Sequence, residues 1–126
     1  YLLVGAFLLL PLKAWASEWY GTASWYDSES ACPFNRNPIR CQVADGSPIR
    51  DLERDQEYFV AFNQAPLGSF LKITNLSNGR SGTYRVRDRG GFEKYGRIID
   101  LHREVFKALG GSLEEGLMEV LIENQG

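Results

Sequence analysis

Short runs in which apolar and polar residues alternate recur along the chain, and a period of two is typical of half-buried β-strands. In residues 70–76, Leu71 and Ile73 alternate with polar side chains. Residues 57–63 are apolar on both faces, which predicts a strand that is covered on both sides, as in a barrel or sandwich. From these patterns we predict six strands, in residues 21–26, 57–63, 70–76, 83–88, 98–100 and 116–123.

One short helix is predicted after the fifth strand. Four apolar residues share one helical face there, namely Leu101, Val105, Phe106 and Leu109. Two glycines follow as a helix stop. Residues 28–49 instead carry closely spaced turn signals, so we predict an irregular segment that serves function or needs a staple. Short strands at this spacing favour a mainly β fold, a small closed barrel.

The first sixteen residues differ from the rest of the chain. Residues 1–12 are almost continuously apolar, and Ala14, Trp15 and Ala16 follow as an A-x-A cleavage pattern. An apolar run of this length is too short to span a membrane and is typical of a secretory signal peptide. We therefore expect residues 1–16 to be a partial signal peptide cleaved after Ala16, and residues 17–126 to form one exported domain, periplasmic or extracellular. The alternative is a buried N-terminal strand or helix.

The charge balance narrows the classes of partner. The chain carries 14 Lys and Arg against 16 Asp and Glu, a net charge of −2, and loss of Lys13 with the signal peptide makes the domain more negative. A nucleic-acid-binding surface needs a basic face, so we expect no nucleic-acid partner. No cysteine lies directly after the cleavage site, where a lipid would be attached, so we expect no stable membrane anchor after cleavage. We expect a monomer without cofactor or metal.

Both cysteines, Cys32 and Cys41, fall in the turn-rich segment. An even number of cysteines in an exported chain predicts a disulfide, which would be the staple of this segment. The alternative is a pair of metal ligands. His102, the single histidine, is far away in the sequence, and the chain has no C-x-x-C motif, so we favour the disulfide.

Two carboxylates follow two of the predicted strands. Asp88 ends the strand after the Asn78-Gly79 hairpin signal, and Asp100 ends the short run after a glycine-rich loop. Such a pair is a candidate for general acid and base chemistry. The alternatives are that Asp88 accepts backbone N–H bonds in a turn and that Asp100 is a helix N-cap. His102 is expected to be a solvated or capping side chain.

The motifs GTASWY, VADGSPI, APLGSFLKITNLSNGRS, VRDRGGF and GRIIDL occur in an order similar to that of the rare lipoprotein A (RlpA) family. More broadly, the chain resembles the double-psi β-barrel that this family shares with the N-terminal domain of expansins. The resemblance covers residues 21–123 and implies a six-stranded barrel whose open groove binds cell-wall glycan strands. Active family members are peptidoglycan lytic transglycosylases, whereas expansins loosen wall polymers without detectable cleavage.

The family's site residues are only partly present. The resemblance places the family's D-R-G aspartate at Asp88 and the D-L-S aspartate at Asp100. The family glutamate falls at Ser47, after Asp45 and Gly46, and the family histidine falls at Phe62. The expected Glu and His are therefore missing, which favours binding over bond cleavage.

Further residues are candidates for contact with a glycan. Trp25, Tyr26 and Tyr95 are the best candidates for a sugar-stacking surface, because aromatic faces pair with the C–H faces of pyranoses. Arg87 and Arg89 flank the first carboxylate, where they either hold its ionised form and grip wall carboxylates or form surface ion pairs.

Asp45 is a further candidate for contact with the glycan and a second candidate partner for Asp88 in acid and base chemistry. The alternative is a simple Asp-Gly turn. Three functions follow from the sequence. The leading one is an RlpA-like or expansin-like barrel that binds peptidoglycan or another wall glycan and is weakly catalytic or non-catalytic. The second is a lytic transglycosylase that uses Asp88 with Asp100 or Asp45. The third is a secreted protein-binding or inhibitory module that uses the segment between the cysteines.

Overall fold

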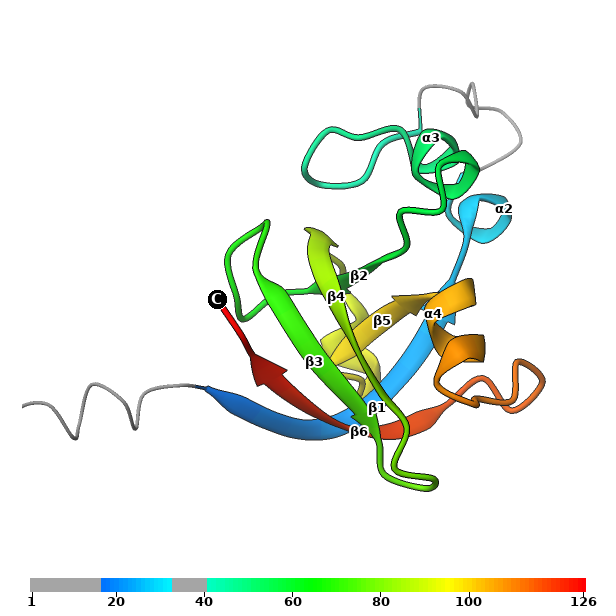
Figure 1. Ribbon diagram of the computed structural model, residues 1–126. Helices are drawn as coiled ribbons and strands as arrows, with labels where there is room; N and C mark the ends of the chain where they lie inside the picture. The colour runs from blue at the N-terminus through cyan, green and yellow to red at the C-terminus, as the bar shows by residue number, and fades with distance from the viewer. Residues whose placement is uncertain (1–16, 33–40) are drawn as a thin grey trace, which may run out of the picture.

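The computed structural model describes residues 17–32 and 41–126, and the expected signal peptide lies outside them. Six strands close into a barrel in the order β1-β5-β2-β4-β3-β6 (Figure 1). Their bounds are β1 Glu18–Tyr26, β2 Phe59–Phe62, β3 Phe70–Asn75, β4 Ser81–Asp88, β5 Ile99–His102 and β6 Met118–Asn124. The β1–β5 and β2–β4 pairs are parallel and the other four pairs are antiparallel. The predicted closed, mainly β barrel is confirmed.

The alternation read from the sequence reappears as burial. Leu71 and Ile73 of β3 are fully buried, and all four residues of β2 are buried, as expected for a strand covered on both faces. β6 buries Met118, Val120 and Ile122 and turns the intervening residues outward. β1 is longer than predicted, because its first residues pair with the end of β6.

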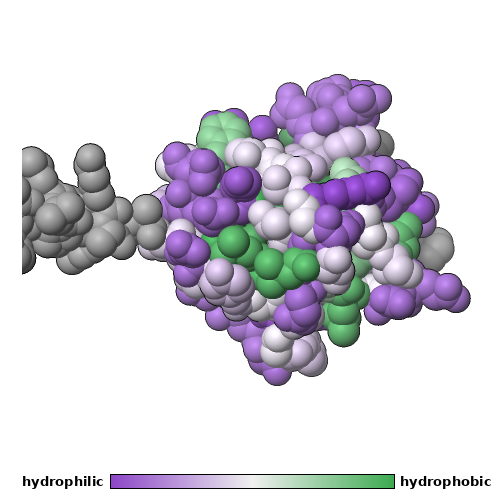
Figure 2. All heavy atoms as spheres, turned by 60° about the horizontal axis from the view of Figure 1, so that its bottom comes forward, coloured by the Kyte–Doolittle hydropathy of each residue, from purple (hydrophilic) through white to green (hydrophobic). Residues whose placement is uncertain are grey.

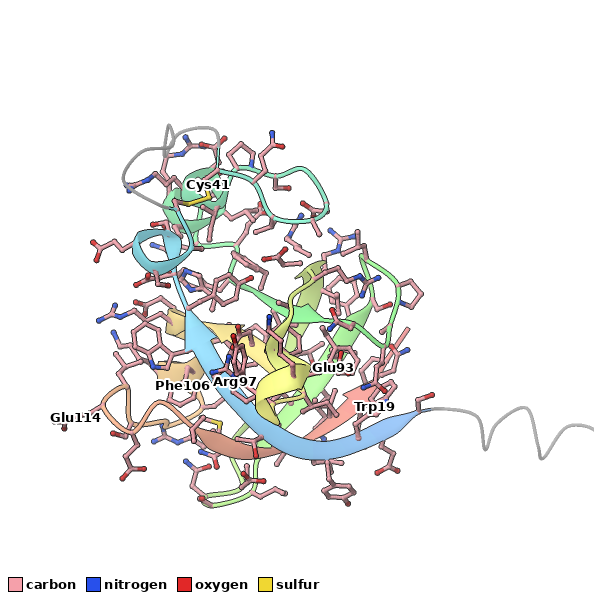
Figure 3. The ribbon with its side chains drawn as sticks, turned by 180° about the vertical axis from the view of Figure 1, so that it is seen from behind. Trp19, Cys41, Glu93, Arg97, Phe106 and Glu114 are labelled. Atoms are coloured by element: carbon pink, nitrogen blue, oxygen red, sulfur yellow. A yellow bond between two sulfur atoms is a disulfide. The ribbon has the colours of Figure 1, made fainter. Side chains whose placement is uncertain are left out.

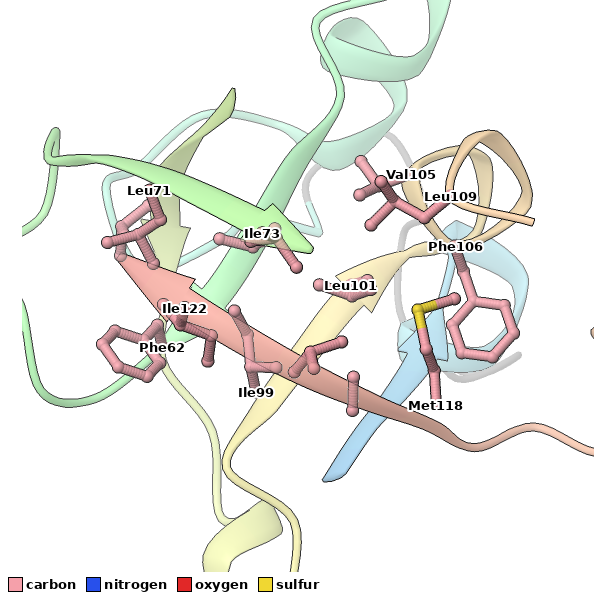
Figure 4. Packing of buried hydrophobic residues seen from close by; sticks show 14 of the residues in the cluster. Phe62, Leu71, Ile73, Ile99, Leu101, Val105, Phe106, Leu109, Met118 and Ile122 are labelled. Carbon is pink, nitrogen blue, oxygen red and sulfur yellow. The ribbon is translucent and has the colours of Figure 1, made fainter. Parts of the chain in front are cut away.

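The predicted helix closes one end of the barrel. This helix, α4 (Arg103–Ala108), buries Val105 and Phe106 against the barrel interior. Figure 4 shows Phe106 beside Met118 of β6. The chain leaves the helix at Gly110, whose φ of +82° is the left-handed conformation that glycine adopts without strain.

The described residues between β1 and β2, 27–32 and 41–58, pack on the outside of the barrel and are called the insertion below (Figure 1). The insertion contains two further short helices, α2 (Ser28–Ala31) and α3 (Ile49–Arg54), whereas we predicted one helix in the whole chain. The expectation of an irregular segment across residues 28–49 was therefore wrong at residues 28–31 and at Ile49, and residues 33–40 lie outside the described residues. α2 forms because Asp27 and Ser30 make a reciprocal capping box.

The insertion has its own small core. Cys32, Val43, Ile49 and Leu52 pack there against Phe59 of β2. The predicted Cys32–Cys41 disulfide is present, with a Cα–Cα distance of 5.8 Å, and Figure 3 shows it at the outer end of the insertion. The staple therefore joins the end of α2 to the segment that leads to α3.

A four-residue 3₁₀ helix, η1 (Phe92–Tyr95), lies between β4 and β5. Figure 2 views the molecule from the side of the turn between β3 and β4. It shows a largely hydrophilic surface with small hydrophobic areas. Large apolar residues that stand exposed include Tyr20, Leu76 and Leu117. Within the described residues, no helix is both long and apolar enough to cross a membrane.

Candidate functional site

Asp88 and Asp100, the two predicted catalytic residues, lie on the strands that flank β2. Ala61 of β2 pairs with Asp88 of β4 on one side and with Asp100 of β5 on the other. Because neighbouring strands are about 4.8 Å apart, the two backbones are separated by roughly 10 Å across β2. The fold therefore brings the two carboxylates to one region of the barrel wall.

A β-bulge turns Asp88 away from the core. Val60 of β2 pairs with Val86, but the next residue, Ala61, pairs with Asp88, so Arg87 is an extra residue in β4. With strict alternation Asp88 would face the same side as Val86, which is fully buried in the core. The extra residue moves Asp88 to the opposite face, where it is half-buried.

Three donors from three parts of the chain hold the Asp88 carboxylate. The Tyr26 hydroxyl of β1 donates to Oδ2 at 2.8 Å. The backbone N–H groups of Ala44 in the insertion and of Arg89 both donate to Oδ1 at 2.9 Å. The expected turn contact is therefore present, together with two contacts that tie Asp88 to distant segments.

Asp100 is held differently. Its Oδ1 accepts a hydrogen bond from the hydroxyl of Ser24, the residue paired with it on β1. The alternative that Asp100 caps the following helix was wrong, because His102 is the N-cap of α4 and its Nδ1 accepts from the backbone of Glu104. Asp100 is therefore a strand residue whose side chain lies half-buried on the barrel wall.

The charges of both carboxylates act on the Tyr26 hydroxyl. Burial of the side chain raises the pKa of Tyr26 far above its usual range, and the charge and hydrogen bond of Asp88, followed by the charge of Asp100, raise it further. The ring packs edge-on against Phe59, with 5.9 Å between ring centroids. Burial and both acidic neighbours therefore favour the protonated hydroxyl, which donates the hydrogen bond to Asp88.

Asp45 and Arg87 form an ion pair next to Asp88. Arg87 Nη1 lies 3.0 Å from Asp45 Oδ2, and Nη2 lies 3.1 Å from Glu57. Burial opposes ionisation of Asp45, but hydrogen bonds from Ser47 and Arg87 outweigh it and lower the pKa. The backbone of Ser47 donates to Asp45 Oδ1, so the expected Asp-Gly turn is present. Arg87 thus bridges two acidic side chains, Asp45 and Glu57, with its one positive charge.

Arg89 points away from the carboxylate that precedes it. Its Nη1 donates to the carbonyls of Phe62, the last residue of β2, and of Ala65 in the following turn. Asn63 in the same turn donates to the carbonyl of Gly90. These contacts anchor the glycine-rich loop after Asp88 to the end of β2.

The other two aromatic candidates lie in different environments. Trp25 packs partly against the core, and its indole N–H donates to the carbonyl of Leu113 at 3.1 Å. Tyr95 of η1 is 68% exposed, with the Lys94 ammonium and the Arg97 guanidinium within 5.5 Å of its ring centroid. Of the three aromatic candidates, Tyr95 presents the most open ring.

The two positions where the resemblance places Glu and His lie in different environments. Ser47 lies in the turn that holds Asp45, beside the ion pair with Arg87. Phe62 is fully buried, and its ring packs edge-on against Trp19 with 4.9 Å between centroids. Position 62 therefore belongs to the hydrophobic core of this chain.

Sequence reasoning missed three participants. Ser24 and Ala44 contact the carboxylates, the latter through a backbone group that no side-chain motif could reveal. The third is Glu53 of α3, which receives a 2.8 Å hydrogen bond from His102. A cavity of about 140 Å³ lies beside that contact. His102 is almost completely buried, so the expectation of a solvated side chain was wrong and that of a capping one was right.

The fold and the two carboxylates together define a class of protein, a closed β-barrel with acidic side chains on its wall. A closed six-stranded barrel holds two carboxylates on its wall, both as acceptors of hydroxyl hydrogen bonds. Such groups can accept further hydrogen bonds from a polyhydroxylated ligand. Within the described residues, no group of three or more His, Cys, Asp or Glu side chains is placed to hold a metal ion.

The comparisons identify the family. The chain is 42% identical over 104 residues to the endolytic peptidoglycan transglycosylase RlpA of Vibrio cholerae and 35% identical over 103 residues to that of Pseudomonas aeruginosa. Each match covers 82% of this chain. The chain belongs to the RlpA-like double-psi β-barrel family, as its sequence motifs predicted. No protein-family model matches it.

Solved structures agree on the fold. A mutant expansin of Clavibacter michiganensis, solved with cellohexaose, superposes with a TM-score of 0.60 at 20% identity over 87% of this chain and 51% of that chain. A Streptomyces papain inhibitor superposes with a TM-score of 0.59 at 21% identity over 86% of this chain and 94% of the inhibitor. The chain spans 34% and 26% of the length of the two RlpA proteins.

Proposed function

We propose that this protein is an exported barrel that binds cell-wall glycan strands, peptidoglycan in particular, and cleaves them weakly or not at all. The similarity to peptidoglycan transglycosylases supports the substrate class. The placement of Asp88 and Asp100 on either side of Ala61 is the observation that carries the proposal, because it supplies two acceptors for sugar hydroxyls on one part of the wall.

The chemistry of the site supports binding rather than cleavage. A lytic cleavage needs a general acid that carries a proton to the leaving oxygen. All three hydrogen bonds to Asp88 come from donors, and donors favour the ionised carboxylate. Histidine at position 62 would have to enter a fully buried apolar site, which costs several kcal/mol for an unpaired polar group. Asp88 is therefore a poor candidate for the general acid, and position 62 is an apolar core site rather than a place for the family histidine.

The test is incubation of the domain with purified peptidoglycan sacculi and with glycan strands freed of stem peptides. Mass spectrometry detects anhydro-muropeptide ends, and sedimentation with the sacculi measures binding. We expect binding without anhydro products, and about ten-fold weaker binding by Asp88→Asn, because a hydrogen bond to a charged group contributes about 1.5–3 kcal/mol. Asp55→Asn is the matched control, since this carboxylate is exposed on the insertion and pairs with Arg54.

A second candidate is a lytic transglycosylase, favoured by the names of the relatives at 35–42% identity. Anhydro products that disappear in Asp88→Asn and persist in Asp55→Asn would establish this activity and refute the non-catalytic proposal. Absence of both products and sedimentation would refute the glycan-binding proposal. It would leave the protein-binding module, the third function considered from the sequence.

A further inference from the structure

Two residues of β1 present hydroxyl groups to the two carboxylates. Ser24 and Tyr26 alternate along the strand and therefore share a face. The Ser24 hydroxyl donates to Asp100, and the Tyr26 hydroxyl donates to Asp88 Oδ2 at 2.8 Å. Strand β1 thus contacts both Asp88 and Asp100. Ser24 contacts the neighbouring strand β5, whereas Tyr26 contacts β4, which is not adjacent to β1.

The hydrogen bonds of Asp88 occupy most of the acceptor positions that a ligand could use. A carboxylate offers about four acceptor positions, two on each oxygen. Oδ1 accepts from two backbone N–H groups, those of Ala44 and Arg89, so both of its positions are used. Oδ2 accepts from Tyr26, which leaves one position open. Among the described residues, Tyr26 is the one side chain that donates to this carboxylate.

We propose that Tyr26 is the positioning residue of Asp88, which it holds as an ionised acceptor so that Oδ2 takes one hydrogen bond from a hydroxyl of the glycan strand. This inference rests on the proposed function for the identity of the ligand. It assigns Tyr26 a role other than sugar stacking, since its ring packs against Phe59 and the insertion core.

The charged side chains around Asp88 do not replace the Tyr26 hydroxyl as a donor. Tyr26 on β1 donates to Asp88, whereas Arg87, next to it in the sequence, pairs with Asp45 and Glu57. The side chains of Arg87 and Arg89 are committed to other partners. Loss of the Tyr26 hydroxyl therefore removes a donor that neither arginine side chain replaces.

The first measurement tests the contact without any ligand. Tyrosine labelled with ¹³C at Cζ is followed by NMR from about pH 7 down to about pH 3, across the usual titration range of aspartate. We expect the Tyr26 resonance to shift as Asp88 takes up a proton, and this shift to disappear in Asp88→Asn. Tyr20, exposed on the same strand, is the internal control and is expected to keep its resonance in both proteins.

The second measurement is sacculus binding at neutral pH by wild type, Tyr26→Phe, Tyr20→Phe and Asp88→Asn. Tyr26→Phe is expected to bind about ten-fold more weakly than wild type, in keeping with one lost hydrogen bond to a charged group. Tyr20→Phe is expected to follow the wild type. In the Asp88→Asn background, Tyr26→Phe is expected to have a smaller effect, because the charged acceptor is already lost. Circular dichroism melting confirms that each variant is folded.

The outcomes separate the two proposals. A Tyr26 resonance that does not follow Asp88, or a Tyr26→Phe variant whose sacculus binding matches that of Tyr20→Phe, overturns the positioning role. A Tyr26 resonance that follows Asp88 in a protein that binds no sacculi supports the positioning of the carboxylate and refutes the glycan-binding function instead.

Discussion

Glu53 joins the insertion to the barrel, and its removal gives a sharp test of how the two parts hold together. Its Oε2 accepts hydrogen bonds from His102 Nε2 at 2.8 Å and from the backbone of Ser28 at 3.1 Å. Because His102 Nδ1 accepts from the backbone of Glu104, the proton of the neutral imidazole lies on Nε2. One carboxylate thus connects α3, the start of α2 and the N-cap of α4.

The expected loss of stability follows from these contacts. Glu53→Ala removes two hydrogen bonds to a charged group and leaves the buried His102 N–H without an acceptor, which costs about 1–3 kcal/mol by itself. The Glu53 side chain is 24% exposed, so water recovers part of the loss. We expect a decrease of about 3 kcal/mol in the free energy of unfolding, which lowers Tm by about 12 °C for a domain of this size.

Urea unfolding at neutral pH measures this quantity. Glu53→Gln keeps an acceptor oxygen and is expected to lose about 1 kcal/mol. Asp51→Ala is the matched control on the same helix, because its carboxylate makes an exposed ion pair with Arg54 and should contribute at most about 0.5 kcal/mol. A Glu53→Ala protein as stable as Asp51→Ala would refute the reasoning.

The same contact predicts a dependence on pH. Burial raises the pKa of Glu53, but the hydrogen bonds from His102 and Ser28 outweigh burial and lower the pKa below its ordinary value of 4.5. The contribution of Glu53 is therefore complete above the ordinary value and is lost as the pH falls through the lowered folded-state pKa. The stability of wild type should decrease more steeply than that of Glu53→Gln in this acidic window.

Two further changes test the disulfide and the core. Cys32→Ser with Cys41→Ser should lower the free energy of unfolding by about 2–3 kcal/mol, because the bond closes a short loop, and an equal urea midpoint with and without reductant in wild type would contradict this. Phe106→Ala should lose about 3–5 kcal/mol, since the ring is fully buried, whereas the exposed Leu117→Ala should change little. Equal urea midpoints of these last two variants would show that Phe106 does not contribute to the core as its burial implies.

The sequence predicted the strands well because their burial has a short period. Leu71 and Ile73 of β3 and the apolar residues of β6 report one face each, and the structure buries that face. The closed barrel was predicted from the spacing of the short strands and from family resemblance. The order of the strands was not predicted, since alternation along a strand does not say which strand lies beside it. The short helices of the insertion were missed because α3 has just two buried apolar residues, Ile49 and Leu52.

The sequence identified the two carboxylates of the candidate site but not the direction in which Asp88 points. Motifs led to Asp88 and Asp100, but strict alternation would have turned Asp88 toward the core with Val86. The bulge at Arg87 reverses that direction, and a bulge depends on the pairing of two strands, which a single strand does not encode. The family histidine position shows the converse, because Phe62 reads as core from its own sequence run and is core.

The insertion belongs to the framework of the site. Ala44, whose N–H group holds Asp88, lies between Cys41 of the disulfide and α3, which Glu53 ties to His102. Both ends of this segment are thus anchored, one covalently and one by hydrogen bonds, and loosening either end weakens the position of the Ala44 N–H. Because Ala44 and Tyr26 share Asp88 as a partner, loss of the disulfide and Tyr26→Phe should not have additive effects on glycan binding.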